Sequence, residues 1–577
     1  MNRSNRQSAD FTETGIHGLN FFLCLFIIIA LALKFYLVFR LKIQGDEFFF
    51  LSHVHSYLRG SLGSQFQNFH VYFFTWLPLI SKNEIDQVIA ARILMYLLLV
   101  GSCIFTYLIG SQYLNRSGAL FGLLCYLSLS NLVVHGASFR ADSLCSFLFL
   151  FAVYQVVKAN RDRTACLAAG VALAIALMIS IKSAFYLVAI LAIMTAKFFA
   201  SSSKTETLKG APQLLLAFSI VYVLLYAGHY LSLDTSSIPQ TSEFISSTYS
   251  KVIITKHLSP GLVFLWDSLY RNPLIWAYLL IGTFWLAFNG KAVLKPGHRP
   301  AMLSFLVLLI SLVFYRNSFP YFYVFIISPA IVLCGVILHK VTSDFQEKGA
   351  PVFLVFASIF SIPVFIAFLF HFSENVANQS GPQRQLLAAV HEVFPEPAPY
   401  IDGCSAISSF PKFGIFMSSW GMENYLAAGR PIFRDLLEKE HPTFIFANYP
   451  SLDLSLSRET QLTTLAFPLM NEDWDILKSN FIHHWGIVYV LGKQFEFDAA
   501  LESKKFEILV PGDYTLEGEG EVYINGVVYQ PGATIFLERG SHIIHPRLVP
   551  SSAVLRWGKS LLKPLISPPQ TLPFYGF

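Results

Sequence analysis

About eleven apolar segments, each of roughly the length that a membrane-spanning helix needs, constrain this chain more than any other feature. A helix crosses the hydrocarbon core of a bilayer with about 20 apolar residues. In that core, only a helix or a closed barrel satisfies its own backbone hydrogen bonds. We therefore expect a multi-spanning α-helical membrane protein. The segments lie near residues 19–39, 88–110, 118–134, 143–158, 164–181, 183–200, 211–231, 273–290, 300–316, 319–338 and 352–372.

The composition excludes an ordinary soluble protein. Of 577 residues, 54% are hydrophobic, 15% aromatic and only 13% charged, and the mean hydropathy is +0.53. The net charge of +5 gives no sign of a nucleic-acid partner. The seven cysteines show no CxxC or zinc-type spacing, so neither a disulfide framework nor a cysteine metal site is expected. No small-residue cleavage site follows the first apolar segment, which we expect to remain as a helix.

The basic residues between the segments predict the orientation of the chain. Cytoplasmic loops carry an excess of Lys and Arg. Alternate loops are basic here if the N-terminus is cytoplasmic, and the long loops at about 40–87 and 232–272 then lie outside. An odd number of spans also places everything after about residue 373 outside, as a periplasmic or extracellular domain of an inner (plasma) membrane protein. The basic loop residues are Arg116, Lys158, Arg161, Arg163, Lys197, Lys204, Lys209, Lys291, Lys295, Arg299, Lys340 and Lys348.

The composition changes near Ser373, which divides the chain into a membrane domain, 1–372, and a soluble α+β domain, 373–577. A helix is expected over 383–393, and a helix followed by a strand over 436–447. Short strands with glycine-containing turns, among them Asn525-Gly526, predict a β-rich end. Residues 553–566 combine apolar positions with basic ones and predict an amphipathic surface helix.

Two adjacent carboxylates, Asp46 and Glu47, follow the first apolar segment and open an aromatic, helix-compatible stretch that ends at Arg59-Gly60. Charge where a span meets water is costly without a role. A helix N-terminus favours negative charge, so the pair could simply cap a helix. It could equally supply a carboxylate that accepts a proton. Nearby Arg40 and Lys42 either extend toward lipid headgroups or hold an anionic lipid headgroup.

The order of motifs resembles the C superfamily of integral-membrane glycosyltransferases, in particular its protein O-mannosyltransferase-like and lipid A aminoarabinose transferase-like branch. The resemblance covers roughly residues 19–340. It departs at Gln67-Asn68-Phe69-His70, where the aminoarabinose branch carries an acid-Lys-Pro turn, which argues against identical substrate use. The matching motifs are Gly45-Asp46-Glu47, Phe69-His70-Val71-Tyr72, Ala90-Ala91-Arg92, Arg140-Ala141-Asp142, Ser180-Ile181-Lys182-Ser183 and Arg316-Asn317-Ser318.

The resemblance implies transfer of a hexosyl or pentosyl unit from a polyprenyl-phosphate donor, with inversion, to a lipid, glycan or protein acceptor on the outer face of a bacterial membrane. Such a reaction needs a base, positive charge for the leaving phosphate, and an apolar groove for the lipid. Asp46 is the expected catalytic base, with Glu47 as its substitute or partner. Arg140, Lys182, Arg316 and His70 are the expected phosphate-binding residues, supported by Asp142 and Arg92. No cofactor is certain, and a divalent metal remains open.

Two other classes of protein fit parts of this pattern. A transporter or flippase for a lipid-linked saccharide predicts internal symmetry and charges near the middle of the spans, whereas these charges gather at one membrane face. A noncatalytic subunit of envelope assembly predicts that Asp46 is dispensable. For single residues, a basic side chain that extends to the headgroups and a histidine in ordinary packing are the alternatives to phosphate binding.

Overall fold

The computed structural model describes residues 3–63, 68–158, 162–200, 204–233, 261–289, 294, 298–315, 317–348, 352–497, 503–547, 551–569 and 574. The chain divides into two compact units. The helical unit comprises Met1–Leu41, Ser56–Thr75 and Ile89–Asn378. The mixed unit comprises Lys42–His55, Trp76–Val88 and Gln379–Phe577.

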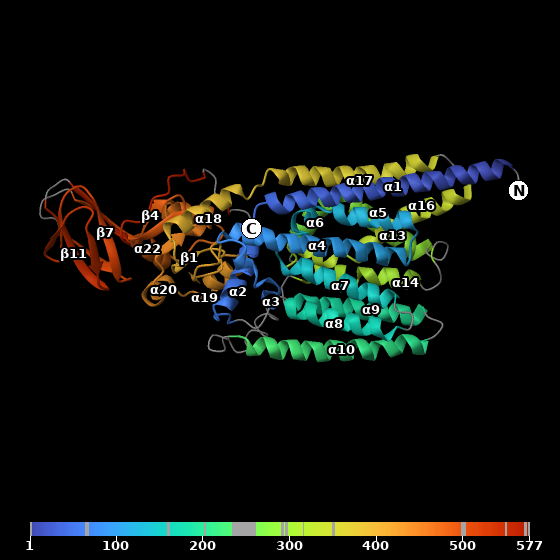
Figure 1. Cartoon of the computed structure of the whole chain (residues 1–577), viewed down its shortest axis with the longest axis horizontal. Helices are drawn as coiled ribbons and strands as arrows, with labels where there is room; N and C mark the ends of the chain where they lie inside the picture. Colours follow the sequence, from blue (N-terminus) through green and yellow to red (C-terminus); the bar gives the residue numbers. More distant parts are fainter. Residues whose placement is uncertain are drawn as a thin grey trace. The chain divides into compact units, whose positions relative to one another are not determined.

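Six described helices are long and apolar enough to cross a membrane. Five of them lie within α1 (Arg3–Arg40), α4 (Glu84–Ser111), α7 (Ala141–Lys158), α10 (Lys204–Leu231) and α17 (Val352–Val376). The sixth, Ile181–Phe199, joins the 3₁₀ turn at Ile181–Ser183 to α9 (Ala184–Ala200). Helices α1 and α17 lie side by side in the helical unit (Figure 1). The expected multi-spanning helical architecture is therefore confirmed.

The remaining predicted segments are also helical, but they are shorter or broken. Leu129 has an extended backbone and separates α5 (Arg116–Ser128) from α6 (Ser130–His135). In the predicted segments at 300–316 and 319–338, short α-helical and 3₁₀ stretches alternate, and Pro320 and Pro329 interrupt the second of these segments. The count of about eleven spans stays a prediction for this reason. These helices are α8 (Arg163–Ile179), α13 (Pro273–Asn289), α14 (His298–Leu303), η5 (Ser304–Val313), α15 (Phe322–Ile326), η6 (Ala330–Cys334) and α16 (Gly335–Lys348). A further helix, α12 (Leu262–Arg271), lies in the stretch that was expected to be a long loop, about 232–272.

Small residues let the helix backbones approach one another. The Cβ that any other residue would place at Gly335 of α16 would collide with the carbonyl oxygen of Gly118 in α5. Membrane helices associate through such close packing, because lipid gives them little hydrophobic driving force. The glycine pair therefore fixes α5 against α16.

The mixed unit is built on an eight-stranded sheet in the order β10-β7-β12-β5-β3-β1-β2, with β4 added beside β5. Strand β1 (Tyr400–Asp402) runs parallel to β2 (Lys412–Phe413) and β3 (Phe444–Phe446), and the pairs around β5 (Val488–Phe497) are antiparallel. The helices of this unit are α18 (Gly381–Val393), α19 (Ser419–Ala428), α20 (Phe433–Glu440), α21 (Arg458–Thr464) and α22 (Asn471–Asn480), with the 3₁₀ turns η1 (Leu77–Leu79) and η7 (Pro450–Leu452). The expected helix over 383–393 and the helix-strand pair over 436–447 are confirmed.

The β-rich end is also confirmed. A second, four-stranded sheet has the order β6-β11-β8-β9. Asn525 and Gly526 join β8 to β9 with positive φ angles of 51° and 84°, as a tight hairpin turn requires. The strands are β4 (Phe481–Trp485), β6 (Lys504–Ile508), β7 (Gly512–Gly518), β8 (Val522–Ile524), β9 (Val527–Tyr529), β10 (Thr534–Leu537), β11 (Gly540–Pro546) and β12 (Ser551–Trp557) (Figure 1).

The amphipathic helix expected over 553–566 is wrong, because β12 occupies its first part. Ala553 and Leu555 alternate with more exposed residues and point into the core, the period of a strand. The strand lies between β5 and β7, which satisfies its backbone on both sides. Ala553 and Leu555, apolar positions of the expected helix, lie on the buried face of a strand instead.

Candidate functional site

The acidic pair lies at the start of α2 (Gly45–Leu58), whose first eleven residues belong to the mixed unit. Glu47 is fully buried, and its Oε2 accepts a hydrogen bond of 3.1 Å from the backbone N–H of Gln44. The backbone N–H of Glu47 donates in turn to the Gln44 carbonyl at 3.0 Å. A carboxylate at the third position of a helix stabilises the helix start when it accepts a hydrogen bond from the backbone N–H of the residue that precedes the helix. Glu47 is thus engaged as a cap, while Asp46 is only half-buried.

Two cations share one carboxylate in the helical unit. Asp142, at the start of α7, accepts a 2.7 Å hydrogen bond from Lys182 Nζ at Oδ1 and lies 3.4 Å from Arg140 Nε at Oδ2. The Lys182 side chain keeps 16% of its surface exposed, whereas the Arg140 and Asp142 side chains are almost fully buried. Both cations also lie over the ring of Tyr321, at 3.5 Å from Arg140 Cζ and 5.3 Å from Lys182 Nζ. This is the cationic cluster of the chain: Arg140, Asp142, Lys182 and Tyr321.

Local structure explains why these side chains meet. Ser180 ends α8 with an extended backbone, and the 3₁₀ turn η2 (Ile181–Ser183) follows, so Lys182 lies at the join between α8 and α9. Arg140 and Asp142 lie where α7 begins. Chain reversals at the ends of neighbouring helices therefore bring together residues 40 positions apart. Sequence reasoning named the three charged members and missed the stacking role of Tyr321, whose place after Pro320 was the only signal.

His70 is buried in the helical unit beside the residue that precedes Arg140. Its ring centroid lies 6.1 Å from that of Phe139, at an interplanar angle of 75°. The Phe139 ring also packs edge to face on Phe74 of α3 (Val71–Phe74) at 4.7 Å. The short helix after His70 is thereby packed on the segment that carries Arg140. His70 and the cationic cluster thus belong to the same part of the helical unit.

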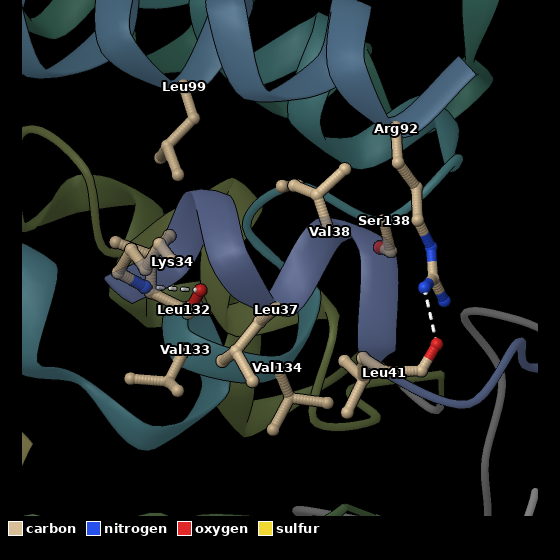
Figure 2. Close-up of a pocket in the computed structure, with 11 residues that line it drawn as sticks. Lys34, Leu37, Val38, Leu41, Arg92, Leu99, Leu132, Val133, Val134 and Ser138 are labelled. Carbon is tan, nitrogen blue, oxygen red and sulfur yellow. Dashed lines mark hydrogen bonds between the residues drawn. The ribbon is translucent and has the colours of Figure 1, made fainter. Parts of the chain in front are cut away.

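Arg92 is buried on α4 and has a structural contact. Its Nη1 donates a 2.6 Å hydrogen bond to the carbonyl of Leu41, the residue that follows α1. Sequence reasoning missed Lys34, whose buried Nζ donates to the Leu132 carbonyl at 2.8 Å. Arg92 and Lys34 line one mainly apolar cavity, at opposite ends (Figure 2). Arg316, the remaining predicted phosphate-binding residue, lies outside the described residues.

A buried polar group of the mixed unit surrounds Cys404. Asn448 Nδ2 donates to Cys404 Sγ at 3.1 Å and to Asp402 Oδ2 at the same distance. Burial raises the pKa of the Cys404 thiol well above its usual range, and the charges of Asp402 and Asp46 add to that effect. Burial also raises the pKa of Asp402, although it accepts hydrogen bonds from the backbone N–H groups of Ser405 and Ala406.

No group of three or more His, Cys, Asp or Glu side chains in the described part of the chain has an arrangement that could hold a metal ion. The chemistry that the described side chains offer is a half-buried carboxylate in the mixed unit and two cations on a shared carboxylate in the helical unit.

Comparisons with known proteins bear on both units. Residues 69–226 match the family described as dolichyl-phosphate-mannose-protein mannosyltransferase, a stretch that includes His70, Arg92, Arg140, Asp142 and Lys182. Asp46 and Glu47 lie before it. No curated protein matches the chain.

The fold is similar to those of solved membrane enzymes. ArnT from Cupriavidus metallidurans, solved with undecaprenyl phosphate, is 13% identical with a TM-score of 0.52, over 78% of this chain and 96% of ArnT. The oligosaccharyltransferase of Archaeoglobus fulgidus in its apo form is 10% identical with a TM-score of 0.54, over 90% of this chain and 76% of that protein. The archaeal oligosaccharyltransferase AglB from Archaeoglobus fulgidus, in complex with an inhibitory peptide and a dolichol-phosphate, gives a TM-score of 0.53 at 10% identity and the same coverage. The family match and the shared fold together confirm the resemblance of this chain to the C superfamily of integral-membrane glycosyltransferases, in its protein O-mannosyltransferase and aminoarabinose transferase-like branch.

Proposed function

We propose that this protein transfers a sugar from a polyprenyl-phosphate carrier to a lipid, glycan or protein acceptor on the outer face of the membrane. The observation that carries the proposal is the cationic cluster. Two cations around one carboxylate leave a net positive charge, and Lys182 remains partly accessible to a ligand. Positive charge of this kind stabilises the phosphate that leaves the sugar.

Asp46 is the proposed base. Glu47 is committed to the helix start, whereas the Asp46 carboxylate is half-buried at the same positive end of α2. It takes the proton of the acceptor hydroxyl as the oxygen attacks the anomeric carbon, and the polyprenyl phosphate leaves from the opposite face, with inversion. Arg140, Lys182, Arg316 and His70 bind the phosphate, and Asp142 orients Arg140 and Lys182.

The neighbours in fold support a lipid-linked donor. ArnT was solved with undecaprenyl phosphate, and AglB with a dolichol-phosphate and a peptide. We extend the lipid-linked donor to the present chain. We also propose that the chain has about eleven spans with a cytoplasmic N-terminus, a membrane domain at 1–372 and an external domain at 373–577. Labelling with a membrane-impermeant thiol reagent checks that orientation. A cysteine introduced at exposed Asp435 is expected to react in intact cells, and protection there would reverse the orientation.

Release of free polyprenyl phosphate from a panel of polyprenyl-phosphate sugars tests the function. The protein in nanodiscs is assayed with and without a membrane extract as acceptor. We expect acceptor-dependent release by the wild type, its loss in Asp46→Asn, and wild-type release by Asp435→Asn, which removes an exposed carboxylate of the mixed unit. Equal release by wild type and Asp46→Asn removes Asp46 from the mechanism. No release from any donor by folded protein favours transport or an assembly role.

A further inference from the structure

The chain just before α2 is held by a residue from the far end of the sequence. The backbone N–H of Ile43 donates to Gln383 Oε1 at 2.8 Å, and Gln383 Nε2 donates to the Ile43 carbonyl at 2.8 Å. Ile43 and Gln383 lie 340 positions apart, and the Gln383 side chain is fully buried. Both residues belong to the mixed unit. The two bonds therefore fix both backbone groups of a residue only three positions before Asp46.

Few side chains can make this pair of bonds. A carboxamide carries a donor and an acceptor side by side, whereas a carboxylate only accepts and a lysine only donates. The Gln383 amide thus pairs with Ile43 as a neighbouring strand would. Loss of one bond leaves a buried backbone group unsatisfied, which favours movement of the segment.

Two further contacts from the same unit hold the first turns of α2. Ser408 Oγ donates to the carbonyl of Phe48 at 3.2 Å. The rings of Phe49 and Phe416 lie with their centroids 4.4 Å apart. Together with the Ile43 pairing, these contacts hold α2 before, at and after Asp46. The residues that supply them, Gln383, Ser408 and Phe416, all come from the soluble C-terminal part of the chain.

We infer that Gln383 is a positioning residue for the reaction, and that the C-terminal domain forms part of the catalytic centre by holding Asp46 in place. The inference rests on the proposed function of Asp46. Gln383 fixes the backbone of Ile43, the position of Ile43 sets where α2 begins, and that start sets where the Asp46 carboxylate lies. A displacement of a reacting group by about 1 Å can lower a rate about 100-fold.

Gln383→Leu removes both hydrogen bonds at similar side-chain size. We expect its kcat for polyprenyl phosphate release to fall about 10-fold to 100-fold, with the KM for the donor changed by less than about two-fold, since donor binding is assigned to other residues. Gln385→Ala is the matched control, because Gln385 is an exposed glutamine on the same helix. It should keep wild-type kcat. Thermal unfolding in nanodiscs verifies that both variants are folded.

Gln383→Glu supplies a readout that a general loss of packing does not give. A protonated carboxyl group accepts from the Ile43 N–H and donates to its carbonyl, whereas an ionised one cannot donate. The ratio of its kcat to that of the wild type should therefore rise as the pH falls from about 8 to about 5. A constant ratio near one at every pH overturns the inference, and so does a wild-type kcat in Gln383→Leu. If Gln383→Leu does not fold, the pH series of Gln383→Glu decides alone.

Asp46→Asn separates the failure of this inference from failure of the proposed function. An inactive Asp46→Asn together with a fully active Gln383→Leu refutes only the positioning role. An active Asp46→Asn refutes the assigned base, and the positioning role falls with it. We expect the kcat of the double variant Gln383→Leu/Asp46→Asn to be no lower than that of Asp46→Asn. Once the side chain at position 46 no longer acts as the base, displacing it does not lower kcat further.

Discussion

The Lys182 ammonium lies 2.7 Å from one oxygen of Asp142, a residue 40 positions earlier in the chain, while Arg140 lies beside the other oxygen. The carboxylate thus holds two cations that would otherwise repel each other. Tyr321 lies against both and limits the directions in which they can turn. One unit of positive charge therefore remains in the cluster.

Lys182→Met is expected to weaken binding of the phosphate. Hydrogen bonds to charged groups contribute about 1.5–3 kcal/mol, so the Kd for polyprenyl phosphate should rise about 10-fold to 100-fold. Titration of nanodisc-embedded protein with polyprenyl phosphate, followed by native mass spectrometry, measures this change. Lys197→Met is the control, because Lys197 lies in the last turn of α9, the helix that follows Lys182, and donates to the carbonyls of Val156 and Val157. An equal loss of affinity in both variants would contradict a local role for Lys182.

Glu47→Ala is expected to destabilise the protein through the helix start. Its carboxylate accepts the Gln44 N–H, and loss of such a cap costs about 0.5–2 kcal/mol. The midpoint of thermal unfolding should fall, whereas Glu47→Gln, which keeps an acceptor oxygen, should fall less. Asp46→Asn serves as the contrast: it should lose turnover with little change in the midpoint. The capping role is refuted if Glu47→Ala unfolds at the wild-type temperature.

Lys493 is expected to make stability rise with pH. Burial lowers its pKa from 10.5 to about 8, although it donates to Ser479 O and Asn480 Oδ1. Between about 8 and 10.5 the unfolded chain binds more protons than the folded one, so the free energy of unfolding increases across this range. The contribution is lost as the pH falls through about 8. Unfolding midpoints of the full-length protein measured from pH 7 to 10 should show this slope, and Lys493→Met should reduce it. Lys505→Met, an exposed control, should retain it.

Phe574→Ala is expected to weaken the packing of α2 against the rest of the mixed unit. The Phe574 ring is 5% exposed and packs on Phe48 and Phe446, with centroids 5.9 and 5.3 Å away. Replacement of a buried Phe by Ala costs about 3–5 kcal/mol when the cavity cannot collapse. The unfolding midpoint and the kcat should both fall. Leu565→Ala removes a fully exposed side chain of the same C-terminal stretch, and a similar loss there would argue against specific packing of Phe574.

The sequence predicted what depends on local pattern, and missed what depends on distant partners. The apolar segments predicted the helices, because helix periodicity and length are local properties. The Asn525-Gly526 turn was also predicted, since a tight hairpin needs residues that readily adopt positive φ angles at these positions. The strand at Ser551–Trp557 was missed, because its short apolar alternation is compatible with a helix until β5 and β7 lie on both sides.

The candidate site shows the same limit. Asp46 and Glu47 are equivalent as sequence, and only the Gln44 hydrogen bond shows which of them is the cap. Gln383 was expected on a helix, but nothing near it in the chain indicates a partner at Ile43. Tyr321 follows Pro320 in the sequence, yet its place over Arg140 follows from the meeting of helix ends. Long-range pairing of this kind carries no short-range pattern.

The pairing of Ile43 with Gln383 can form only late in the synthesis of the chain. Ribosomes add roughly 5–20 residues per second, so Gln383, 340 residues later, leaves the ribosome about 17–68 s after Ile43. During that interval the helix with the acidic pair lacks the partner that fixes its first residues, although several membrane helices are already made. A nascent chain stalled before Gln383 should therefore carry an exposed, protease-sensitive segment around residues 42–48. Completion of the chain, rather than insertion of its helices, would then be the step that switches the enzyme on.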